Sequence, residues 1–121
     1  MFDHVGVRVK DMVSSKLFYT AALAPLGLSV QYEDKAFTGF GPKGAPGLWL
    51  MGQSEKGGPA HVALAAKDRA AVNAFHAAAI GAGGKDNGKP GLRPEYSANY
   101  YGAFVIDPDG NNIEAVCHSP V

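Results

Sequence analysis

The feature of this sequence that most constrains its fold is an internal repeat. The segment HVGVRV, which starts at His4, is matched by HVALAA, which starts at His61, 57 residues further along the chain. The same offset also superimposes four later pairs, namely Asp11 on Asp68, Phe18 on Phe75, Leu23 on Ile80 and Gly27 on Gly84. Matches that persist in one register over this distance indicate two modules built on one structural plan.

Within the first module, apolar and polar residues alternate over residues 3–9, which predicts a strand with one apolar face. Asp11 is placed to cap a helix. The apolar residues Val13, Leu17 and Ala21 at four-residue spacing, with Phe18 and Ala22 beside them, predict an apolar stripe that ends at Pro25 and Gly27. Three short strands follow, at about residues 28–33, 36–40 and 47–51.

The second module repeats the pattern. We predict a strand at 60–65, a helix capped by Asp68, a short strand near Gly84, a long loop over 86–98, and strands at 100–106 and 112–118. The predicted fold class is therefore α+β, with two tandem βαβββ modules that form a curved mixed sheet of half-barrels and carry a helix on the outer face of each. A single domain over 1–121 contains module one (1–53), a linker (53–58) and module two (59–121).

Charge and composition narrow the function classes. Eleven Lys and Arg residues balance eleven Asp and Glu residues, so the chain lacks the basic field that binding to nucleic acid or an anionic membrane needs. No segment has the roughly 20 apolar residues of a membrane span, and Cys117 is the one cysteine. These features predict a cytoplasmic protein that binds neither nucleic acid nor membrane.

Three residues could together hold a metal ion. By the two-residue period of a strand, His4, His61 and Glu114 each lie on the face away from the apolar residues of their own strands. Two imidazoles and one carboxylate that converge in a half-barrel would give a divalent ion three ligands and leave positions open for water or substrate. The pattern therefore predicts a catalytic rather than a structural metal site, with Zn, Fe, Mn, Ni or Co as the ion.

The chain combines tandem modules with four characteristic segments, namely the opening DHVGVRV, the helix start DMVSSKLFY, the second-module HVAL and the closing DPDGNNIEAV. In these features it resembles the vicinal oxygen chelate superfamily, which includes glyoxalase I, bleomycin resistance proteins and extradiol dioxygenases. The resemblance implies the same metal ligands, His4, His61 and Glu114, and a homodimer in which the site lies within one chain or is shared between two. One departure is clear: a glutamate of the glyoxalase I type is replaced by Trp49, which can neither bind metal nor move a proton.

Further residues are candidates for contacts with the substrate. Trp49 and Met51 would line the site with apolar surface, which favours a partly hydrophobic or aromatic small molecule. Arg93 in the predicted loop could pair with an anionic group of the substrate. Tyr100 and Tyr101 point to opposite faces of their strand, so one of them should face the cavity as a hydrogen-bond donor or general acid.

The sequence therefore predicts a glyoxalase- or dioxygenase-like metal-dependent enzyme that chelates a small substrate through vicinal oxygens. Lyase, isomerase, thiol-transfer and dioxygenase steps remain open. The alternative is a metal-free protein of the bleomycin-resistance type that sequesters its ligand. A third possibility is a subunit with a vestigial site.

Overall fold

The computed structural model describes residues 1–52 and 55–121. Part of the predicted linker, residues 53–54, lies outside the described residues. The first module contains β1 (Val5–Arg8), α1 (Met12–Leu23), β2 (Ser29–Glu33), β3 (Phe37–Gly41) and β4 (Leu48–Met51). The second contains β5 (His61–Ala65), α2 (Arg69–Gly81), β6 (Lys85–Leu92), β7 (Tyr101–Ile106) and β8 (Asn112–Cys117). The predicted βαβββ order is thus confirmed in both halves.

The two modules share one sheet topology. The strand order is β1-β4-β3-β2 in the first sheet and β5-β8-β7-β6 in the second, and in each sheet one parallel pair joins the first and last strands of the module. The registers correspond as well, because Gly6 pairs with Trp49 as Ala63 pairs with Glu114. The structure is therefore the predicted two-module α+β fold, formed by two mixed sheets rather than one.

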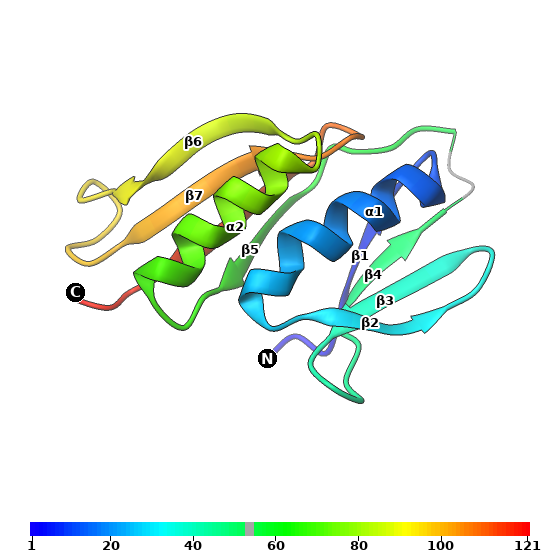
Figure 1. Cartoon of the computed structure of the whole chain (residues 1–121), viewed down its shortest axis with the longest axis horizontal. Coiled ribbons are helices and arrows are strands. Elements are labelled where there is room, and N and C mark those ends of the chain that lie inside the picture. The colour runs from blue at the N-terminus through cyan, green and yellow to red at the C-terminus, as the bar shows by residue number, and fades with distance from the viewer. Residues whose placement is uncertain (53–54) are drawn as a thin grey trace.

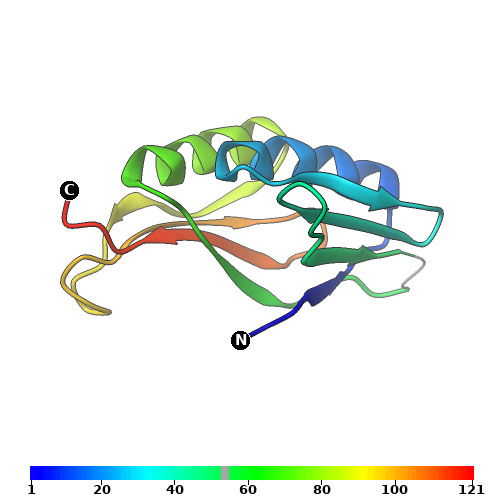
Figure 2. The same cartoon turned by 90° about the horizontal axis from the view of Figure 1, so that it is seen from below.

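Both helices cover the same side of the structure (Figure 1). In Figure 2, α1 and α2 lie side by side above the two sheets, whose other faces point away from the helices. One apolar core joins the modules, and its largest buried side chains are Phe18, Tyr19, Phe40 and Phe75. Because the helices occupy one side of both sheets, the uncovered faces point to the same side and do not face each other.

The N-terminal caps of the two helices agree with the sequence. The side chain of Asp11 accepts the backbone N–H of Val13, and that of Asp68 accepts the backbone N–H of Ala71. The predicted apolar stripe of α1 was wrong at Val13 and Leu17, which are 71% and 69% exposed, and right at Phe18 and Ala22, which are buried. The helix packs on the core through Ser15, Phe18, Tyr19, Ala22 and Leu23.

The predicted loop over 86–98 was wrong in its first half, because residues Lys85–Leu92 form β6. This edge strand pairs with β7 through two register shifts, and it contains Gly88, Pro90 and Gly91. Proline and glycine are tolerated at an irregular edge strand, and their presence makes the sequence resemble a loop.

No helix in the described part of the chain is both long and apolar enough to cross a membrane.

Candidate functional site

The open face of the second sheet brings two of the predicted metal ligands together. His61 begins β5 and Glu114 lies in the middle of β8, which runs parallel to β5. The imidazole Nε2 of His61 lies 3.3 Å from Oε1 of Glu114. The histidine side chain is 52% exposed, whereas the glutamate side chain is only 2% exposed. A buried carboxylate therefore meets an accessible imidazole at the surface of the sheet.

The hydrogen bonds of His61 define which nitrogen is available. Nδ1 lies 3.0 Å from the backbone carbonyl oxygen of Asn112. A carbonyl can only accept, so Nδ1 carries the hydrogen and the neutral ring has its lone pair on Nε2. This is the arrangement in which histidines commonly bind metal ions, with the distal nitrogen oriented by a hydrogen bond on the other side of the ring.

Glu114 is oriented by Tyr100, whose hydroxyl donates a hydrogen bond to Oε2. Burial, followed by this hydrogen bond and the negative charge of Glu114, raises the pKa of Tyr100 to about 12. Tyr100 therefore keeps its proton at neutral pH and acts as a donor. The bond to Oε2 leaves Oε1 directed toward His61.

The geometry of this pair fits a metal ion. Two ligand atoms that each lie about 2.1 Å from one ion at a tetrahedral angle are about 3.4 Å apart. The observed separation of 3.3 Å between Nε2 of His61 and Oε1 of Glu114 is close to that value. Two lone-pair acceptors at this distance repel each other unless a proton or a cation lies between them.

His4 also has a hydrogen-bond partner at Nδ1, but it does not lie with His61 and Glu114. Its Nδ1 lies 2.7 Å from a carboxylate oxygen of Asp3, which leaves Nε2 free. His4 and His61 both line a hollow of about 440 Å³ between the edges of the two sheets. Within residues 1–52 and 55–121, however, no group of three or more His, Cys, Asp or Glu side chains is arranged to hold a metal ion.

The open face of the first sheet is apolar. A hollow of about 700 Å³ is lined by Trp49 and Met51 together with Tyr32, and the rings of Tyr32 and Trp49 are 5.6 Å apart. A Cβ at position 39 would lie only 2.9 Å from the Trp49 ring, so Gly39 makes room for the indole. Trp49 stands where the second module has Glu114, so this face offers aromatic surface in place of that carboxylate, and His4 also lines the hollow.

The remaining predicted site residues lie on different faces of the second sheet. Tyr101 lies on the helix side, where its hydroxyl donates to Asn73 of α2 over 2.7 Å, and it is therefore not carried into the proposed site. Tyr100 lies beside Glu114 on the open side. Arg93 follows β6 and lines a third hollow on the open face of the second sheet, next to Phe104.

Two neighbours of the site were missed by the sequence reasoning. The ring of Phe104 is stacked on that of His61 at 6.3 Å, and the ring of His118 meets that of Tyr100 at 5.3 Å. Strand parity could have found His118, because it is four residues beyond Glu114 and so shares its face. Phe104 pairs with Glu114 across β7 and β8, a register that becomes visible only in the folded sheet.

The chain is similar in sequence and in structure to proteins of one superfamily. The sequence profile of the Glyoxalase/Bleomycin resistance protein/Dioxygenase superfamily matches residues 1–115. A glyoxalase/bleomycin resistance protein from Albidiferax ferrireducens T118 is 32% identical, with 99% of each chain covered and a TM-score of 0.84. No protein of curated function matches the sequence.

Two more distant structures share the fold. A glyoxalase/bleomycin resistance protein/dioxygenase family enzyme from Burkholderia phytofirmans PsJN is 18% identical, with 97% of this chain and 98% of that chain covered and a TM-score of 0.75. A glyoxalase I mutant (V278E) from Zea mays is 24% identical, with 95% of this chain but only 43% of that chain covered and a TM-score of 0.69.

Proposed function

The chain belongs to the glyoxalase/bleomycin resistance protein/dioxygenase superfamily, and from this premise we propose that it is a metal-dependent enzyme that chelates a small oxygenated substrate. The observation that supports this best is the pair formed by His61 and Glu114, in which an oriented lone pair faces a carboxylate oxygen at 3.3 Å. His4 is the proposed third protein ligand, and the ion is Zn, Fe, Mn, Ni or Co.

We propose further that the site is completed by a second copy of the chain. The uncovered faces of the two sheets point to the same side of one protomer (Figure 2), and His4 is not grouped with His61 and Glu114 among the described residues of that protomer. Large apolar side chains are exposed on or beside these faces, including Tyr32, Phe37 and Tyr96. A homodimer that places the first sheet of one protomer opposite the second sheet of its partner would cover them and bring His4 to the partner's His61 and Glu114.

In this site the residues of the chain have distinct roles. His61, Glu114 and His4 would hold the divalent ion, which would supply Lewis-acid chemistry to oxygens of the substrate. Tyr100 donates its single O–H to Oε2 of Glu114 and keeps its proton at neutral pH, so its proposed role is to orient the carboxylate that would hold the ion. Trp49 and Met51 supply the apolar wall, which excludes water and favours a substrate with a hydrophobic or aromatic part.

The nature of Trp49 limits the reaction. Its indole has no carboxylate with which to remove a proton from the substrate, so a proton-abstraction step that needs a base on the first sheet is not proposed. Lyase, isomerase, thiol-transfer and dioxygenase steps that do not need such a base are compatible with the residues present.

Metal analysis of the purified protein tests the proposal. We expect a bound divalent ion in the wild-type protein and its loss in His61→Ala and in Glu114→Gln, whereas His76→Ala, a histidine paired with Asp86 elsewhere, should retain it. After treatment with a chelator, addition of one of the five ions should raise the Tm of the wild type. A metal-free protein whose Tm responds to none of these ions would contradict the proposal and favour a ligand-sequestering protein.

A further inference from the structure

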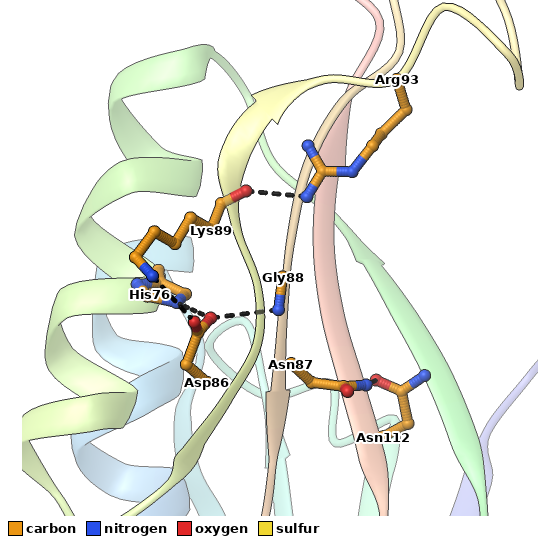
Figure 3. A network of polar contacts seen from close by, with 7 residues as sticks. All are labelled: His76, Asp86, Asn87, Gly88, Lys89, Arg93 and Asn112. Carbon is orange, nitrogen blue, oxygen red and sulfur yellow. Dashed lines mark hydrogen bonds and ion pairs between the residues drawn. The ribbon is translucent and has the colours of Figure 1, made fainter.

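Arg93 is held in a fixed position on the open face of the second sheet. Its Nη1 donates to the backbone carbonyl of Gly91 over 2.8 Å, and its Nη2 donates to that of Lys89 over 2.7 Å (Figure 3). The guanidinium carbon lies 5.6 Å from the centre of the Phe104 ring. These contacts use two of the five N–H donors of the guanidinium and leave the others for a ligand.

The backbone is shaped to admit this guanidinium. A Cβ at Gly88 would lie 3.2 Å from Nη2 of Arg93, and a Cβ at Gly91 would lie 3.2 Å from Nη1. At position 88 a Cβ would also approach the Phe104 ring to 2.8 Å. The two glycines therefore form a cradle in which the arginine head lies against the strand and the aromatic ring.

The positive charge of Arg93 has no acidic partner. Within residues 1–52 and 55–121 no carboxylate forms an ion pair with it. The nearby Asp86 is already engaged, because it accepts hydrogen bonds from His76, from the backbone N–H of Gly88 and from Lys89 (Figure 3). Lys89 pairs with Asp86 at 3.2 Å and does not line this hollow, and Arg93 is the one cation among the residues that do.

The hollow beside Arg93 has the lining of an anion site. Its volume is about 270 Å³, and it is bounded by Asn87, Gly88, Arg93, Tyr96, Phe104 and Asn112. The amide of Asn87 donates to the side-chain oxygen of Asn112 over 3.3 Å, so the amide nitrogen of Asn112 can donate to a ligand. No acidic side chain lines the hollow.

This hollow adjoins the proposed metal site through Phe104. One neighbour of the Phe104 ring is the His61 ring at 6.3 Å, and another is the guanidinium of Arg93 at 5.6 Å. Tyr96, which also lines the hollow, lies 5.0 Å from Tyr100, the partner of Glu114. The positive charge of Arg93 also acts on Tyr100 by lowering its pKa, although burial and Glu114 outweigh this effect.

We propose that the hollow at Arg93 binds a carboxylate group of the substrate, so that the substrate class is a hydrophobic or aromatic organic acid whose carboxylate is separate from its chelating oxygens. One guanidinium without a counter-charge matches a single negative charge, and its planar donors suit a carboxylate. A dianionic phosphate would find only this one unpaired cation. The assignment rests on the proposed function for the position of the chelating oxygens, but binding of the carboxylate does not require the metal.

The test uses metal-depleted protein and the probe 3,4-dihydroxybenzoate, with its neutral carboxamide as the matched ligand. We expect NMR-monitored titration of the wild type to show the acid bound roughly tenfold more tightly than the amide. Arg93→Met should abolish this preference, and Arg93→Lys should retain part of it. Lys89→Met, which removes a neighbouring cation already paired with Asp86, should leave the preference unchanged.

A second variant guards against a local folding defect. Gly91→Ala, whose Cβ would lie 3.2 Å from Nη1 of Arg93 and no closer than 3.9 Å to its next neighbour, should displace the guanidinium and reduce the preference while Arg93 is still present. Equal binding of acid and amide by the wild type, or an unchanged preference in Arg93→Met, would overturn the assignment. Because the metal is absent from this titration, failure of the metal proposal would leave the carboxylate result intact, and the reverse also holds.

Discussion

The buried hydrogen bond between Tyr19 and Asp107 joins the two modules and allows a quantitative prediction. Tyr19 lies on α1 of the first module and is fully buried. Its hydroxyl donates over 2.5 Å to Asp107, the residue that follows β7 in the second module. Asp107 also accepts the backbone N–H groups of Asp109 and Asn111 and the side-chain amide of Asn111. Burial, followed by the charge of Asp107, raises the pKa of Tyr19 well above its usual value.

Tyr19→Phe removes this hydroxyl without creating a large cavity. A buried hydrogen bond to a charged group contributes roughly 2 kcal/mol, because a carboxylate that loses a donor in the core is not resolvated. For a chain of 121 residues this corresponds to a decrease in Tm of roughly 8 °C. Urea denaturation followed by circular dichroism measures the change in the free energy of unfolding.

The chain contains a matched control for this substitution. Tyr32, in β2, donates to Asp34 over 2.6 Å at an exposed position, so Tyr32→Phe removes the same type of hydrogen bond in water. We expect this control to cost less than about 0.5 kcal/mol. If Tyr19→Phe destabilised the protein no more than Tyr32→Phe does, the argument that the buried carboxylate holds the modules together would be refuted.

Two further predictions concern packing and pH. A Cβ at Gly84 would lie 2.7 Å from the ring of Phe18, so Gly84→Ala should destabilise the protein by about 1–3 kcal/mol. The control Gly81→Ala, at a position with open space around it, should change the free energy of unfolding by less than about 1 kcal/mol. Equal effects of the two substitutions in urea denaturation would contradict the close packing of Gly84 against Phe18. The hydrogen bond with His76, followed by two other donors, lowers the pKa of Asp86 to about 2. The ionised carboxylate therefore stabilises the fold above its ordinary pKa of 3.8, and this stability is lost as the pH falls toward 2. The difference in urea midpoint between the wild type and Asp86→Asn should shrink from pH 6 to pH 2.5, and a constant difference would be inconsistent with this titration.

The repeat made the fold predictable from the sequence. Equivalent histidines, one immediately before β1 and one at the start of β5, led to the correct module order. The ladders place Trp49 and Glu114 at the equivalent positions that the alignment of the modules predicts. Strand parity also predicted that His61 and Glu114 share a face, and their side chains lie 3.3 Å apart.

Other features depended on tertiary contacts that a pattern does not contain. Lys85–Leu92 resembles a loop by composition, and only pairing with β7 makes it a strand. The α1 helix has apolar residues on two faces, so spacing alone could not show that Leu17 is exposed. The choice between Tyr100 and Tyr101 required knowing which face of β7 the helices cover. The relative placement of the modules, which keeps His4 apart from His61 and Glu114 of the same chain, likewise could not be read from the sequence.

The central claim, a metal ion shared between two protomers, can be tested by complementation of two defective variants. His4→Ala and Glu114→Ala carry different tags and are coexpressed, and the mixed dimer is isolated through both tags for metal analysis. If His4 of one protomer joins His61 and Glu114 of its partner, each parent dimer should hold no ion, while the mixed dimer regains one intact site and about half the metal of the wild type. A mixed dimer without metal, beside a wild type that holds it, would contradict the shared site.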